Sequence, residues 1–141
     1  MPGTNLLTRI DRHIIKRHTF LDAAGFGEAG DSIVLWTCTG EVLIKYLSAF
    51  CSTLLTGSGT TIELGCVGNT AELIAQVDPT AIDADEFWTS GTPEISASNA
   101  VTNKLISANV LITVGAGGPI TAGVIEFVAL WVPISANGNL A

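Results

Sequence analysis

The chain has 141 residues, enough for one domain that buries a hydrophobic core without disulfide staples. Hydrophobic residues make up 48% of it and no apolar run reaches the roughly 18 residues of a membrane-spanning helix, so composition excludes disorder and argues against a membrane partner. The formal net charge of -7 argues against nucleic-acid binding by the chain as a whole.

Residues 1–20 are predicted to form a basic arm. All three arginines lie here, and apolar residues from Leu6 to Ile14 recur at helical spacing, so we expect a short-helical or extended segment. Because the rest of the chain is acidic, we expect the arm to bind an acidic protein surface, such as that of a neighbouring copy. Nucleic acid and a solvated terminus are the alternatives. The arm residues expected to contact a partner are Arg9, Arg12, His13, Lys16, Arg17 and His18.

A linker rich in glycine and alanine, 21–31, separates this arm from a β-domain over 32–135. Strands are expected at 32–38, 42–50, 61–67, 71–77, 104–107, 110–114 and 123–133, with short candidates at 86–88 and 94–96. Residues 136–141 are expected to be a loose tail, and no secretory signal is expected at the start of the chain.

Alternation assigns faces to several of these strands. Ile62, Leu64 and Cys66 are expected to point inward. Along 42–50, one face is predicted to carry Val42, Ile44, Tyr46 and Phe50, and the opposite face Glu41, Lys45 and Ala49. Along 71–77, Leu73, Ala75 and Val77 are expected to share a side.

Short strands separated by turn residues, without strand-to-helix alternation, predict an all-β fold. We expect an antiparallel β-sandwich or jelly roll that carries the N-terminal arm. A closed barrel is the alternative.

The three cysteines fall in predicted strands, and their spacing matches no zinc site. Buried free thiols are the favoured interpretation. The alternative is a disulfide, within or between chains, that involves Cys38, Cys51 or Cys66.

The stretch 78–88 is acidic and could offer oxygen ligands to Ca²⁺, but it lacks the alternating pattern of a calcium loop. We expect a solvated or partner-facing loop, which could receive the basic arm of a neighbour. Its partner-binding residues are predicted to be Asp83, Asp85, Glu86 and Trp88.

Trp36 and Trp131 lie in strong strand patterns and are expected in the core. Trp88 is expected to be a surface anchor, and a glycan-binding platform with Asp85 and Glu86 is an alternative.

No catalytic residues, metal site or cofactor can be nominated. His13 and His18 are five residues apart with two cations between them, which does not suit a metal pair. Both histidines lie in the arm, so no Ser/His/Asp set can be drawn, and the chain is predicted not to be an enzyme.

The order of parts resembles small structural proteins of tailed bacteriophages. The resemblance rests on the arm L-T-R-I-D-R-H-I-I-K-R-H-T-F, on A-E-L-I-A-Q and D-A-D-E-F-W, and on the closing strand V-I-E-F-V-A-L-W-V-P. It implies a virion protein assembled in the host cytoplasm, most similar to head decoration (cement) proteins. Such proteins form symmetric oligomers, often trimers, and use terminal arms to bind neighbours.

On this interpretation the partners are other copies of the chain and the major capsid protein or other virion proteins. The low content of charged residues, 13%, favours permanent subunit contacts. Deleting residues 1–20 is then expected to preserve the fold and abolish particle binding. The alternative is a neck, collar or tail-fibre accessory subunit that binds a receptor or a carbohydrate.

Overall fold

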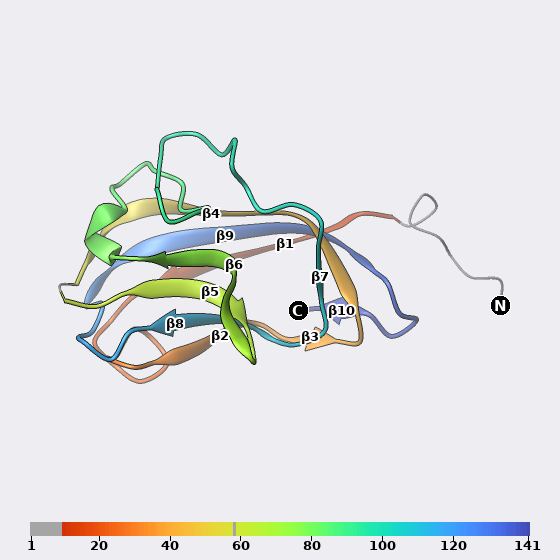
Figure 1. Cartoon of the computed structure of the whole chain (residues 1–141), viewed down its shortest axis with the longest axis horizontal. Helices are drawn as coiled ribbons and strands as arrows, with labels where there is room; N and C mark the ends of the chain where they lie inside the picture. The colour runs from red at the N-terminus through yellow and green to blue at the C-terminus, as the bar shows by residue number, and fades with distance from the viewer. Residues whose placement is uncertain (1–9, 58) are drawn as a thin grey trace.

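The computed structural model describes residues 10–57 and 59–141, and within them it contains ten β-strands and one 3-10 helix (Figure 1). The first five strands are β1 (Arg12–Thr19), β2 (Ser32–Trp36), β3 (Cys38–Thr39), β4 (Val42–Thr56) and β5 (Ile62–Cys66). The 3-10 helix η2 (Pro79–Ala81) follows β6 (Asn69–Val77). The remaining strands are β7 (Lys104–Ile106), β8 (Val110–Val114), β9 (Ala122–Pro133) and β10 (Asn139–Leu140).

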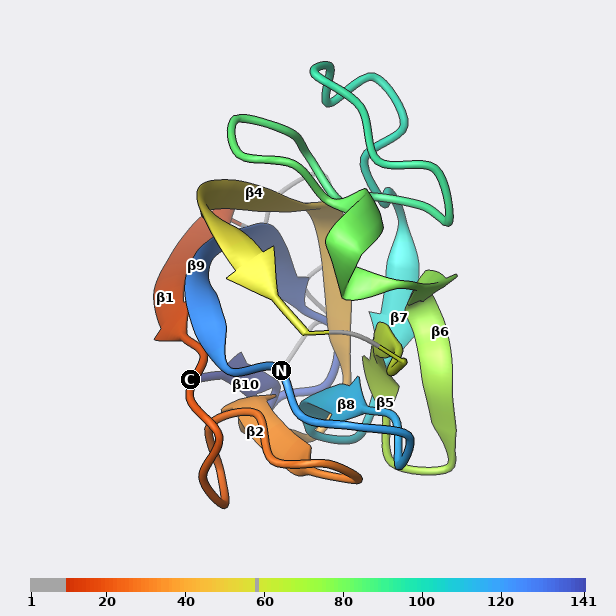
Figure 2. The same ribbon diagram turned by 90° about the vertical axis from the view of Figure 1, so that its left-hand side faces the viewer.

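Eight strands form two four-stranded sheets, and every pairing is antiparallel. Sheet A has the order β1-β9-β4-β7, and sheet B has the order β2-β8-β5-β6. The short strands β3 and β10 pair separately. Viewed along the strands, β1, β9 and β4 lie on one side of the molecule and β2, β8 and β5 on the other (Figure 2), and apolar side chains of both sheets form one core. The prediction of an all-β, antiparallel chain is confirmed.

The first strand lies within the predicted arm. β1 pairs with β9 along its whole length, and the next residue, Phe20, is fully buried. Ile14 packs against the core and His18 is buried, so alternate side chains of β1 point inward. The basic residues between them hide this alternation in the sequence. The β-sheet therefore begins at Arg12 rather than at Ser32, and residues 1–9 of the predicted arm lie outside the described residues.

Residues 21–31 contain no helix or strand and connect β1 to β2. The Asp31 carboxylate holds this loop closed, because it accepts hydrogen bonds from the backbone N–H groups of Gly25 at 2.7 Å and Gly27 at 3.3 Å.

Register shifts in β4 and β6 change two of the predicted faces. In β4 the shift at Lys45 inserts an extra residue, so Ala49 is fully buried rather than on the outer face with Lys45. In β6, Ile74 and Val77 pair with Leu64 and Ile62, so that two residues of β6, Ala75 and Gln76, lie opposite the single residue Glu63 of β5. Ala75 is consequently exposed and does not share the buried side of Val77. The inward faces of Ile62, Leu64 and Cys66 are confirmed.

Residues 82–103 form no strand; the candidates at 86–88 and 94–96 meet only in a single bridge between Phe87 and Glu94. The segment instead runs along the edge of β4. The N–H of Leu47 donates to the carbonyl of Val101 at 2.9 Å, and the N–H of Trp88 donates to that of Ala49 at 2.8 Å. Irregular backbone thus satisfies edge groups that β7 is too short to reach.

The predicted loose tail is paired instead. β10 forms a ladder with β3, and Leu140 is buried. Thr37 and Ala141 exchange two backbone hydrogen bonds, of 2.7 and 2.9 Å. Strand pairing and the burial of one leucine therefore tie the last residues to the domain.

Candidate functional site

Most of the arm residues predicted to contact a partner have contacts within the chain. The Lys16 ammonium donates to the carbonyl of Leu35 at 3.0 Å and so connects β1 of sheet A to β2 of sheet B. The Arg12 guanidinium lies 5.2 Å from the centre of the Trp131 ring. Both side chains stabilise the chain's own fold, whereas the sequence predicted that they bind the acidic surface of a partner. Arg9 lies outside the described residues.

His18 is enclosed by aromatic rings and is unavailable to a partner. It is 7% exposed, with its ring centre 4.6 Å from that of Phe20 and 6.4 Å from that of Phe26. Its Nε2 lies 3.2 Å from the carbonyl oxygen of Phe26, so this nitrogen carries the proton and donates. Burial lowers the pKa of His18, and the Phe26 carbonyl offsets only part of this effect.

Arg17 and His13 are the predicted arm residues that face outward. They pair with Glu126 and Leu130 of β9, on the face of sheet A away from the core. Arg17 lies 3.7 Å from Glu126, and both side chains are well exposed, which makes this a weak ion pair.

The acidic turn, residues 83–86, projects carboxylates beside β4. Glu86 accepts from the N–H of Asp83 at 2.9 Å, and Asp85 donates its N–H to the carbonyl of Cys51 at 2.8 Å. Asp85 has a φ of 68°, a left-handed conformation that aspartate tolerates better than most residues. The carboxylates of Asp83 and Asp85 have no hydrogen bond or ion pair with any residue that the structure describes.

Trp88 is fully buried, so the prediction of a surface anchor is wrong. The reason is the hydrogen bond from its N–H to Ala49, which draws the segment against β4 and turns the large ring into the core. Because the buried ring cannot stack on a sugar, a glycan-binding platform at Trp88 is also excluded. Trp36 and Trp131 are buried as predicted.

The three cysteines are free thiols. Cys51 and Cys66 are buried and Cys38 is partly buried. Burial raises the pKa of each thiol, that of Cys66 to about 12, so the uncharged form prevails at neutral pH.

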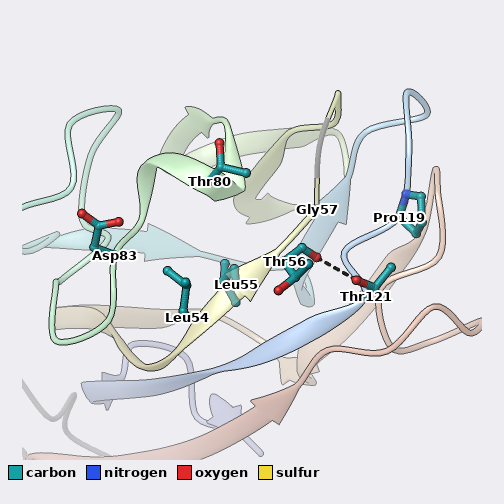
Figure 3. A pocket seen from close by; sticks show the side chains of 8 residues that line it. All are labelled: Leu54, Leu55, Thr56, Gly57, Thr80, Asp83, Pro119 and Thr121. Atoms are coloured by element: carbon teal, nitrogen blue, oxygen red, sulfur yellow. Dashed lines mark hydrogen bonds between the residues drawn. The ribbon is translucent and has the colours of Figure 1, made fainter.

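A hollow of about 470 Å³ opens at one end of the molecule, between the end of β4, η2 and the turn before β9 (Figure 3). Its apolar wall consists of Leu54, Leu55 and Pro119. Its polar groups are three threonines and Asp83, and the Thr121 hydroxyl donates to the carbonyl of Thr56 at 3.2 Å. None of the lining residues is a histidine, cysteine or lysine. Across residues 10–57 and 59–141, no cluster of three or more metal-ligating side chains occurs.

An apolar stripe crosses the outer face of sheet A. We call Ile15, Tyr46, Val128 and Leu130 the outer stripe; Ile15 pairs with Val128, and Leu130 pairs with Tyr46. Ile15 is 63% exposed and Leu130 is 39% exposed, although both are large apolar residues.

Two ion pairs flank the outer stripe. Arg17 pairs with Glu126 on one side, and Lys45 pairs with Asp11 at 3.0 Å on the other. Protein–protein interfaces commonly have an apolar centre and a polar rim. The outer stripe and its two flanking ion pairs have this arrangement. Sequence reasoning missed this stripe because it placed Ile15 in a free arm. The sequence offered one signal for it: residues 123–133 are apolar on both faces, and this strand pairs with β1 in the structure.

No family model, curated protein or solved structure matches this chain. Among the described residues, no helix has both the length and the apolar character needed to cross a membrane.

Proposed function

We propose that this chain is a non-enzymatic structural subunit of a bacteriophage particle, and specifically a head decoration subunit. On this proposal it forms a closed homo-oligomer, for which the phage resemblance predicts a trimer, and bridges neighbouring capsid subunits. The observation that carries the proposal is the outer stripe. Ile15 and Leu130 remain exposed in a chain whose surface is poor in charge, and a sister subunit would remove them from water.

We further propose that the two sheets form a jelly-roll sandwich. With β3 and β10 set aside, the first strand pairs with the eighth, the second with the seventh, the third with the sixth and the fourth with the fifth. A long antiparallel hairpin rolled into two sheets has this pairing, and viral capsid and lectin domains use the jelly roll.

The proposed mechanism is passive. Removing a fully exposed Ile or Leu side chain from water contributes about 1.5–3 kcal/mol, and each contact is repeated around the oligomer. In a closed symmetric oligomer every copy of the apolar surface is buried against a neighbour, so no free surface remains from which a fibre could grow. The assembled subunits would then hold capsid subunits together against the outward pressure of the packaged genome.

A receptor- or carbohydrate-binding accessory of the neck, collar or tail is the second candidate. Trp88 no longer supports it, but the hollow at the end of β4 does, because threonine hydroxyls and the Asp83 carboxylate could pair with sugar hydroxyls. A decoration subunit requires no such ligand.

Light scattering on the purified full chain, with and without reductant, tests self-assembly. We expect a native mass of three times 14.6 kDa that reductant does not change, because the described thiols are free. The same protein should co-sediment with phage heads that lack it. A monomer at every concentration, or sugar binding without head binding, would contradict the decoration function.

A further inference from the structure

Arg17 and the acidic turn stand at the same level along sheet A. Arg17 of β1 pairs with Glu126 of β9, which pairs with Phe50 of β4. The next residue of β4, Cys51, donates its N–H to the carbonyl of Glu86 at 2.9 Å. With neighbouring strands about 4.8 Å apart, three strand spacings separate Arg17 from the turn, too far for contact within one chain.

Both charged groups lack a strong partner inside the chain. Arg17 has only its weak pair with Glu126, and the Asp83 and Asp85 carboxylates have none among the described residues. Arg17 belongs to β1, which also carries Arg12 and Lys16 and has no acidic residue, in a chain whose net charge is -7. The carboxylates of Asp83 and Asp85 could therefore pair with Arg17, but only with the Arg17 of another copy, because β1 cannot reach the acidic turn of its own chain.

The outer stripe lies on the same face of sheet A, beside the level of Arg17: Ile15 and Val128 are each two residues along their strands from Arg17 and Glu126. Residues 82–103 rise beyond β4, whereas no loop within residues 10–57 and 59–141 covers the outer side of β1 and β9 (Figure 2). The outer edge of β1 also has no strand partner among the residues that the structure describes, because β1 is the terminal strand of sheet A. This face of sheet A thus combines the exposed apolar outer stripe with the basic strand β1 at one side and the acidic turn beyond β4 at the other.

We propose that a second copy of this chain packs on the outer stripe and places its acidic turn beside Arg17 of the first copy. This inference rests on the proposed self-assembly and names its contact. A rotation about an axis parallel to the strands keeps every residue at its level, so it can bring the turn of one copy to Arg17 of the next. Three copies around such an axis close a ring in which the outer stripes face the axis.

Charge distribution favours a second copy in this orientation over direct pairing of two β1 edges. Antiparallel pairing centred on Ile15 would set Arg17 of one copy opposite His13 of the other, and β1 contains no carboxylate that could pair with Arg17. Contact between β1 and the acidic turn joins opposite charges at every interface.

A charge swap in the full chain tests the contact. We expect Arg17→Glu and Asp83→Arg each to weaken self-association at least tenfold, as measured by light scattering over a concentration series. The double variant should regain the native mass, because opposite charges face each other again. Lys104→Glu is the matched control: Lys104 is an exposed cation on β7, at the other edge of sheet A, and its loss should not change the mass.

The outcomes separate the two proposals. A monomeric wild-type chain would overturn self-assembly and this inference together. A wild-type oligomer whose mass neither single substitution changes, or a double variant that stays dissociated, would overturn only the contact. Thermal unfolding of each variant checks that it is folded.

Discussion

At the scale of single residues, burial decides roles that the amino-acid type leaves open. Trp88 lies in an acidic stretch and was predicted at the surface, but its backbone bond to Ala49 turns it inward. His18 was predicted to bind a partner, but it fills a space between Phe20 and Phe26. In both cases the deciding contact comes from a residue that no local pattern indicates. Arg17 faces outward because successive side chains of β1 point to opposite faces of sheet A.

Because the pKa of His18 is lowered in the folded state, we expect the folded protein to lose stability in mild acid. Because burial lowers its pKa below 6.5, the unfolded chain binds this proton more tightly than the folded chain. Its stabilising contribution is therefore present above pH 6.5 and falls as the pH drops toward the lowered pKa. Lys16 strengthens the effect and Asp31 opposes it. We expect the melting temperature to fall between pH 7 and pH 5.

His18→Gln is the comparison for this prediction. Glutamine keeps an amide donor for the Phe26 carbonyl but does not titrate, so the variant should lose less stability over the same pH interval. Equal pH dependence in the two proteins would show that His18 is not responsible.

At the scale of elements, the sequence predicted the strands of the β-domain and misjudged the two ends of the chain. Alternation located β5, and nearly continuous apolar runs located β8 and β9. It missed β1 because cations occupy both faces, and β10 because two residues carry no periodicity. The faces of β4 and β6 changed because bulges shift the alternation by one residue.

Removal of residues 1–20 is now expected to damage the fold. The deletion takes away β1, the buried His18 and the fully buried Phe20, and the loss of a buried phenylalanine alone costs about 3–5 kcal/mol. We expect a lower melting temperature and weaker near-ultraviolet circular dichroism than in the full chain. An unchanged melting temperature would mean that β1 adds little to sheet A.

At the scale of the whole molecule, strand order could not be deduced from local patterns. β1 and β9 are neighbours in sheet A although about a hundred residues separate them, and the acidic turn reaches the level of Arg17 only through this pairing. The sequence did indicate that a basic segment and an acidic loop could meet between copies. Their common level along the sheet, and the outer stripe on the same face, could be recognised only from the structure.

The proposed three-membered ring makes a prediction about mixed subunits. In an equimolar mixture of Arg17→Glu and Asp83→Arg chains, contacts between unlike variants join opposite charges. A ring of three always contains at least one contact between like variants, so the mixture should recover less of the native mass than the double variant does. Full recovery by the mixture would indicate a reciprocal pair of chains instead.

The burial of all three tryptophans also has an optical consequence. Trp36 lies in sheet B, Trp131 in sheet A and Trp88 in the segment along β4, and none is more than 3% exposed. Indole emission from the native state therefore comes from buried rings, of which Trp131 also lies beside the Arg12 guanidinium. A red shift on unfolding would report the entry of solvent to these rings, so the protein carries an intrinsic fluorescent probe of its own packing.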